Sequence, residues 1–137
     1  MINDNKTLMI DFATCLRVPM RDDGRRLLIS PQRRAGKWKY MAPEIVSEQS
    51  FDGFAVDIWS VGVILFRMVS GCLPWDIAAD VDRRFLYTSN GFLVQLCTKW
   101  NLNLSPSLMD LLQKMFFRDP RNRLSLRQIC VHEWVVR

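Results

Sequence analysis

The sequence predicts a mainly α-helical domain with a small β element near its N-terminus. Residues 54–70 are apolar on almost every side of a helix, which is typical of a helix covered by protein all round. Residues 105–116 begin with Ser-Pro, a helix start, and then repeat apolar side chains at helical spacing. Ser125 precedes Gln128 by three positions, the pattern of a capping box that opens a last helix.

The first part of the chain predicts one short strand and a long loop. Residues 6–10 form an apolar run of strand type after a turn at residues 3–5. From residue 14 to residue 39 the periodicity is lost, and Pro19, Asp-Asp-Gly at 22–24 and Ser-Pro at 30–31 indicate an exposed loop. Loops of this length inside a compact domain are usually functional. Pro43 can begin a short helix that ends the loop.

The apolar stretch 54–70 is the predicted central helix, buried on every face. Gly71 follows its last turn as a stop signal. Asp57 and Arg67 interrupt the stretch, so it falls short of the ~18 unbroken apolar residues that a membrane span needs. A carboxylate in a buried helix requires hydrogen-bond donors, and we therefore expect Asp57 to hold a neighbouring loop.

The second half of the chain predicts three further features. Residues 73–89 form an acidic and polar passage that ends at a Ser-Asn-Gly break. The next helix has one apolar face, and the helix after Ser105 halts before Asp119-Pro120. The inward side chains are predicted to be Phe92, Leu93, Leu96, Cys97 and Trp100, then Leu108, Leu111, Leu112, Met115 and Phe116, and finally Leu126, Ile129 and Cys130.

Composition fits one globular domain inside the cell. The chain has 137 residues, of which 49% are hydrophobic, enough for a core. Residues 1–20 carry charges and lack the apolar run of a secretory leader, so an intracellular, cytoplasmic location is expected. Four cysteines stand far apart without a Cys-x-x-Cys pair, which indicates reduced, buried thiols and neither a zinc site nor a disulfide framework.

The net charge of +5 is concentrated in residues 11–44, where eight cations face four acids. These basic residues are not interleaved with stacking aromatics, and no RNA- or DNA-binding motif is present. The pattern favours a solvated loop that holds a phosphate or an acidic partner over a nucleic-acid surface.

Several motifs follow one another in a recognisable order. They are Asp11-Phe12-Ala13, Ala42-Pro43-Glu44, Asp57-Ile-Trp-Ser-Val-Gly62, Asp119-Pro-Arg-Asn-Arg-Leu-Ser125 and His132-Glu-Trp134. In this order the chain resembles the C-terminal lobe of a eukaryotic-type protein kinase, with DFG-like, APE and D-x-W-S-x-G motifs. The pattern is most similar to serine/threonine kinases of the calcium/calmodulin-dependent type. Residues 1–137 would then be a partial kinase domain that runs from the DFG-like strand to the last helix.

The resemblance implies roles for the residues of the first motifs. Asp11 would bind Mg²⁺ that bridges the ATP phosphates, and Phe12 would pack beneath it. Taken alone, Asp11 is a turn residue at the end of a strand. Residues 11–44 would form the activation segment, with Lys37 and Tyr40 in its substrate-facing end.

Two hydroxyl residues of this segment are candidate phosphorylation sites. Ser30 or Thr14 would accept a regulatory phosphate, which Arg33 and Arg34 could hold. Ser30-Pro31 is equally a plain turn signal.

Three further residues have structural roles in the resembled family. Asp57 would brace the catalytic loop through backbone amides, and Glu44 would pair with Arg123. Without the resemblance, Glu44 is a solvated charge after a proline. His132 and Trp134 are expected in the core or as capping residues.

The chain departs from the family pattern at two positions. Ala13 replaces the glycine of DFG, which removes backbone freedom at this hinge. Lys37 replaces a threonine, and a lysine there could pair with the catalytic aspartate.

Other parts of the pattern are not in the sequence. The single histidine is His132, so there is no His-Arg-Asp triplet, and no G-x-G-x-x-G occurs. We therefore expect a truncated domain, from a partial gene model or a cropped chain, that is inactive alone.

Two functions remain open at this point. The first is a fragment of a serine/threonine protein kinase whose parent transfers the ATP γ-phosphate to protein Ser or Thr, with ATP and Mg²⁺ as cofactors. The second is a noncatalytic pseudokinase or protein-interaction module. Asp11 favours the first, and Ala13, Lys37 and the truncation favour the second. Expected partners are ATP and protein substrates, with neither nucleic acid nor membrane.

Overall fold

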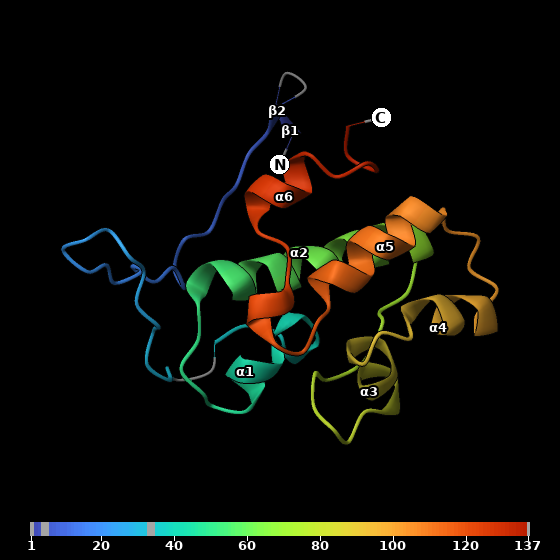
Figure 1. Ribbon diagram of the computed structural model, residues 1–137, viewed down its shortest axis with the longest axis horizontal. Helices are drawn as coiled ribbons and strands as arrows, with labels where there is room; N and C mark the ends of the chain where they lie inside the picture. The colour runs from blue at the N-terminus through green and yellow to red at the C-terminus, as the bar shows by residue number, and fades with distance from the viewer. Residues whose placement is uncertain (1, 4–5, 33–34, 137) are drawn as a thin grey trace.

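The structure is a computed structural model that describes residues 2–3, 6–32 and 35–136, with side chains from residue 8 onward. Short helices surround one long helix, and two paired strands of two residues each precede them (Figure 1). The elements in chain order are β1 (Ile2–Asn3), β2 (Lys6–Thr7), η1 (Trp38–Tyr40), α1 (Pro43–Val46), α2 (Gly53–Ser70), α3 (Arg83–Ser89), α4 (Leu93–Lys99), α5 (Pro106–Met115), η2 (Pro120–Asn122) and α6 (Leu126–Cys130).

Helix α2 is the axis of the fold, with α5 lying along it (Figure 1). It begins at an N-cap, where the Asp52 carboxylate accepts a hydrogen bond from the Phe54 N–H at 2.9 Å. It ends at the predicted Gly71, whose φ of 75° is left-handed. Gly62 allows α5 to come close, because a Cβ at this position would lie 2.8 Å from a ring carbon of Phe116.

The centre of the core is a cluster of four fully buried aromatic rings. Trp59 comes from α2, Trp75 from the following loop, Phe85 from α3 and Phe116 from the end of α5. The Trp75 ring centroid is 5.0 Å from that of Trp59 and 4.9 Å from that of Phe116, at inclined angles that aromatic pairs prefer. These contacts join segments that are far apart in sequence.

The prediction that α2 is buried on every face is wrong. Its buried side chains lie on one side, whereas Phe54, Val61, Ile64 and Met68 are exposed, Met68 by 78%. The spacing of these four places them on one helical face. By length and composition alone α2 is also long and apolar enough to cross a membrane, a test that core helices of soluble proteins pass as well.

The helix starts predicted by serine are confirmed. Ser105 Oγ accepts a hydrogen bond from the Leu108 N–H at 3.3 Å, and Ser125 and Gln128 form the capping box. In α5 the predicted apolar stripe is buried. In α6, however, Leu126 is 63% exposed, Cys130 is exposed and Ile129 is only half-buried, so the predicted inward face is wrong.

Helix α3 lies inside the passage that the sequence pattern left without a helix. Its N-cap is Asp82, whose Oδ1 accepts hydrogen bonds from the Arg84 and Phe85 N–H groups. Helix α4 has the predicted buried residues Leu93, Leu96 and Cys97, while Phe92 is exposed.

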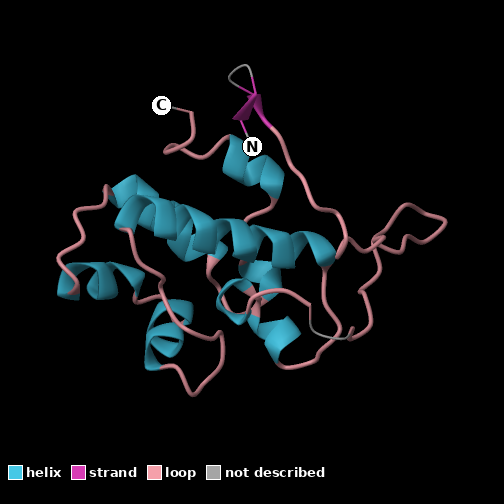
Figure 2. Cartoon of the chain, turned by 180° about the vertical axis from the view of Figure 1, so that it is seen from behind, coloured by secondary structure: helices cyan, strands magenta, loops and turns pink. Residues whose placement is uncertain are grey.

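The strand predicted over residues 6–10 is not formed at that length. Only Lys6 and Thr7 pair, with Asn3 and Ile2 of β1, and residues 8–10 are extended and exposed. The following loop extends away from the helices in both views (Figures 1 and 2). It is held by an isolated bridge between Ile29 and Phe51.

The expectation of buried thiols holds for one cysteine only. Cys97 is buried, and burial raises its pKa. Cys15, Cys72 and Cys130 are free and exposed.

Candidate functional site

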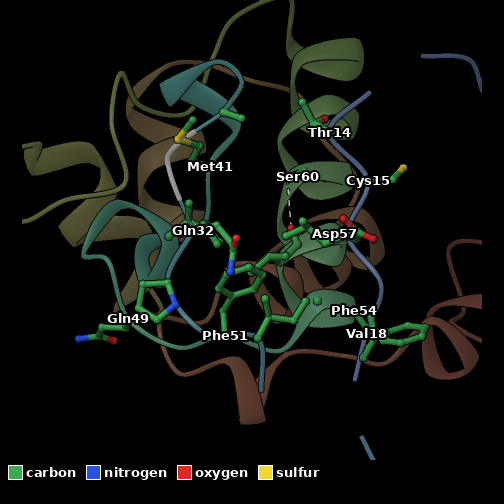
Figure 3. Close-up of a pocket in the computed structure, with 18 of the residues that line it drawn as sticks. Thr14, Cys15, Val18, Gln32, Met41, Gln49, Phe51, Phe54, Asp57 and Ser60 are labelled. Carbon is green, nitrogen blue, oxygen red and sulfur yellow. Dashed lines mark hydrogen bonds between the residues drawn. The ribbon is translucent and has the colours of Figure 1, made fainter. Parts of the chain in front are cut away.

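A cavity of about 430 Å³ separates the exposed loop from the first half of α2. Thr14, Cys15 and Val18 line one side, and Gln32, Met41 and Gln49 line the other (Figure 3). Asp57 and Ser60 of α2 contribute to the wall between them. The cavity therefore lies between the two ends of the predicted activation segment and the central helix.

Asp57 lines this cavity without a donor from the described part of the chain. Its side chain is exposed, contrary to the expectation that it is buried. Its contact with a neighbouring loop stays a prediction. The atoms that cover part of the carboxyl group nevertheless raise its pKa through desolvation. A carboxylate in such a position at the cavity wall has free acceptor capacity.

The end of the segment is attached to the core by the predicted ion pair of Glu44 and Arg123. Arg123 Nη1 and Nη2 donate to the two carboxylate oxygens of Glu44, each at 2.7 Å. The exposed fractions of the two side chains are 1% for Arg123 and 6% for Glu44. This bidentate geometry is the strong form of an arginine–carboxylate contact.

The remaining donors of Arg123 are also used. Its guanidinium donates to the carbonyl oxygens of Phe117, Ala55 and Arg118 at 2.8 to 3.1 Å. It also lies over the Trp59 ring, 4.8 Å from the centroid. Arg123 thus connects α1, α2 and the segment after α5.

Tyr40, a predicted substrate-facing residue, is attached to α2 through its backbone and through its side chain. Its carbonyl accepts a hydrogen bond from Ser60 Oγ at 2.9 Å, and its phenol oxygen accepts one from Arg67 Nη1 at 2.6 Å. Lys37 lies three positions earlier and is exposed. No pairing of Lys37 with a carboxylate is found among the described residues. Its pairing with a catalytic aspartate stays a prediction.

An ion-pair network beside Tyr40 was not predicted from the sequence. Lys39 Nζ lies 3.1 Å from Asp76 Oδ1, and Arg84 contacts both Asp76 and Asp82. Hydrogen bonds from Lys39, then from Arg84, lower the pKa of Asp76. The acidic character of residues 73–89 was the only sequence signal for this network.

Asp11 is in a left-handed conformation at φ 64° and is exposed. The Ala13 N–H lies 3.4 Å from Asp11 Oδ1, as in a local turn, and Phe12 is 62% exposed. Among the described residues no group of three or more His, Cys, Asp or Glu side chains is placed to hold a metal ion. The described residues thus offer Asp11 as a single Mg²⁺ ligand and do not by themselves form an ATP–Mg²⁺ site.

The other predicted residues are placed as follows. Thr14 and Ser30 are exposed and accessible, whereas Arg33 and Arg34 lie outside the described residues. His132 Nε2 is 2.9 Å from Asp110 Oδ2, and its Nδ1 accepts a hydrogen bond from the Trp134 N–H at 3.3 Å. Trp134 packs against the core, so both residues hold the C-terminal turn.

Comparison with known proteins gives one family over nearly the whole chain. Residues 1–135 match the family described as the protein kinase domain. The chain is 37% identical over 110 residues to serine/threonine-protein kinase chk1 of Schizosaccharomyces pombe. The matched residues cover 80% of the chain and 21% of that protein. It is 32% identical over 108 residues to serine/threonine-protein kinase SRK2E of Arabidopsis thaliana, with coverages of 78% and 30%.

A third relative covers more of the chain. Maternal embryonic leucine zipper kinase of Danio rerio is 33% identical over 134 residues, which is 98% of the chain and 18% of that protein. The chain therefore spans less than a third of the length of these curated relatives. Their variety does not confirm the narrower likeness to calcium/calmodulin-dependent kinases.

Proposed function

This chain belongs to the protein kinase domain family and is a fragment of such a domain, and we propose from that premise that its complete domain transfers the γ-phosphate of ATP to Ser or Thr of protein substrates. The family consists of phosphotransferases, and relatives of this chain are named serine/threonine-protein kinases. In the complete domain ATP and Mg²⁺ would be the cofactors. Neither nucleic acid nor a membrane is part of the proposal.

The observation that carries the proposal is the buried pair of Glu44 and Arg123. Its two members come from motifs 79 positions apart, Ala42-Pro43-Glu44 and Asp119-Pro-Arg-Asn-Arg-Leu-Ser125. A buried arginine that donates to five acceptor oxygens on four residues holds the end of residues 11–44 in one place. Fixed geometry at this position supports the role of residues 11–44 as an activation segment that positions a substrate.

The cavity beside Asp57 supports the same function. The resemblance assigns to Asp57 the backbone amides of a catalytic loop, and Asp57 has acceptor capacity toward a cavity of about 430 Å³. We infer that this cavity receives the catalytic loop of the complete domain. Asp11 would supply one carboxylate ligand to Mg²⁺, and Ser30 or Thr14 would accept a regulatory phosphate.

An intracellular, cytoplasmic location belongs to the proposal as well. Three free and exposed thiols are compatible with a reducing compartment, where ATP is also available to a kinase. Apart from the residue changes at Ala13 and Lys37, the described residues offer no observation that favours the alternative of a noncatalytic module.

The experiment compares this chain with any longer protein that includes these residues and that its gene encodes. The 137-residue chain should transfer no label from ATP to a protein substrate, because it lacks a catalytic base, worth ~10² to 10⁴ in rate, and a phosphate-binding lysine. The longer protein should transfer label, and its Asp11→Ala variant should not. No transfer by the folded longer protein would overturn the kinase proposal. Asp11-dependent transfer by the short chain would show that it forms a phosphate site by itself.

A further inference from the structure

An arginine without a carboxylate partner lies where η1 meets the C-terminal half of α2. Arg67 is the only basic residue of α2, and it is exposed. Among the described residues, the one hydrogen bond from its side chain goes to the phenol oxygen of Tyr40, at 2.6 Å. A phenol is neutral, so this contact orients the guanidinium but leaves its positive charge without compensation from the described residues.

The guanidinium also has donors to spare. It carries five N–H groups, of which the contact with Tyr40 uses one. Arginine binds carboxylates through two parallel N–H groups, and Arg67 retains enough donors for such a contact. An oriented, exposed and unneutralised guanidinium is suited to an acidic group that comes from another molecule.

The carboxylates that lie beside η1 are engaged with other groups. Asp76 is contacted by Lys39 and Arg84, and the same hydrogen bonds lower its pKa, so it is ionised and occupied. Asp82 contacts Arg84 and accepts hydrogen bonds from backbone N–H groups of α3 and of Asp76. Neither is left to neutralise Arg67.

The contact with Tyr40 orients Arg67 before any ligand arrives. The backbone of Tyr40 is held to α2 by the hydrogen bond from Ser60 Oγ to its carbonyl oxygen. A cation in the last turn of a helix also interacts favourably with the helix dipole, but that interaction requires no particular placement of the guanidinium. The contact with Tyr40 does specify one, and pre-placed groups lose less entropy on binding.

We propose that Arg67 binds an Asp or Glu side chain of the protein substrate, so that this kinase domain prefers acidic sequences. The inference rests on the proposed function, since Tyr40 and Lys37 belong to the segment assigned to substrate positioning. Lys37, exposed and without a carboxylate partner among the described residues, adds positive charge to the same segment. The substrate class is therefore an acidic peptide around the phosphorylated residue.

The test measures binding of fluorescent peptides to the purified 137-residue chain by anisotropy. One peptide has Ser flanked by Asp and Glu, a second has Asn and Gln at those positions, and a third has Lys. The acidic peptide should bind more tightly than both others, and rising salt should weaken its binding. Arg67→Gln should weaken it about fivefold, the upper range for an exposed ion pair, and leave the amide peptide unchanged.

Arg127→Gln is the matched control, because it removes the same charge from an exposed residue of α6. Equal binding of the acidic and amide peptides, or equal losses in the two arginine variants, would overturn the proposal. Circular dichroism shows whether each variant remains folded, and Lys37→Gln gives a second reduction of charge in the same segment. Phosphate transfer by the longer protein without a preference for acidic peptides would refute the acidic docking alone, while acid-selective binding without any transfer would refute the kinase function alone.

Discussion

The pair of Arg123 and Glu44 places two charges where water does not reach them. Removing one partner leaves the other charge buried, which typically costs ~3 to 5 kcal/mol. We expect Arg123→Ala to lower the free energy of unfolding of the chain by about that amount, measured by urea denaturation. The variant also leaves three backbone carbonyl groups without the hydrogen bonds that Arg123 donates to them.

Two further variants show which part of the contact matters. Arg123→Lys keeps the charge but not the two-pronged geometry, so it should recover only part of the loss. Arg127→Ala, on the exposed face of α6, should change stability by less than about 0.5 kcal/mol. A loss that small in Arg123→Ala would contradict the role of the pair.

Removing the charge of Asp57 should stabilise the chain, whereas Arg123→Ala should destabilise it. Burial raises the pKa of this carboxyl group in the folded chain, so its ionised form is less favourable there than in the unfolded chain. At neutral pH the charge therefore destabilises the fold, and this penalty disappears as pH falls through the raised pKa. Asp57→Asn is expected to raise the unfolding midpoint at pH 7 and to have little effect below about pH 3.8.

The control is Asp22→Asn in the exposed loop, which should shift the midpoint little at either pH. A lower midpoint for Asp57→Asn at pH 7 would show that the carboxylate has donors in the chain alone. In the longer protein a lower midpoint is expected, since the proposed catalytic loop would supply those donors.

At the scale of elements, the contact of α2 with α5 depends on the missing side chain of Gly62. Alanine at a helical position is ordinarily more stable than glycine by ~0.5 to 1 kcal/mol. Here the added methyl group would lie 2.8 Å from Phe116 and 3.2 Å from Met115. We expect Gly62→Ala to destabilise the chain by ~1 to 3 kcal/mol in urea denaturation, the usual cost of overpacking.

A second substitution tests the cause of that loss. Phe116→Leu removes the ring that the methyl group meets, so the two changes together should cost less than the sum of each alone. Strict additivity, or a stabilising Gly62→Ala, would contradict the close packing of the two helices.

The elements that sequence predicts well are those with local signals. Ser105, Ser125 and Gly71 act on backbone groups within a few residues, and each begins or ends a helix as expected. Helix α3 was missed because its cap, Asp82, lies in a polar passage that resembles a loop. The apolar sequence of α2 predicts a helix, but which faces are covered depends on the elements that pack against it.

In the candidate site, too, some contacts can be predicted from the sequence and others cannot. The resemblance to protein kinases predicts the contact of Glu44 with Arg123, because each residue stands in a motif of that family. It does not predict the partners of Arg67 or Asp76, whose contacts form only when η1, α2 and α3 meet in space. Asp57 is exposed, against expectation, because burial of a helix does not imply burial of every side chain on it. Its bracing of a catalytic loop stays a prediction.

Over the whole molecule, exposed apolar side chains gather on one face of α2, made of Phe54, Val61, Ile64 and Met68. Other exposed apolar residues lie in the first loop and near the C-terminus. Exposed apolar surface of this kind tends to associate. We expect the 137-residue chain, made alone, to self-associate through the α2 face as its concentration rises, as measured by sedimentation velocity.

A substitution on that face tests whether association depends on it or on the rest of the surface. Burying one large apolar side chain is worth ~1.5 to 3 kcal/mol, so replacing Met68 with lysine should weaken association at least about tenfold. Val81→Lys is the matched control, because Val81 is 84% exposed and lies in the loop between α2 and α3. If both variants weaken association equally, added charge and not the α2 face is responsible. If the parent chain stays monomeric at every concentration, the exposed face of α2 is tolerated by the chain without a partner.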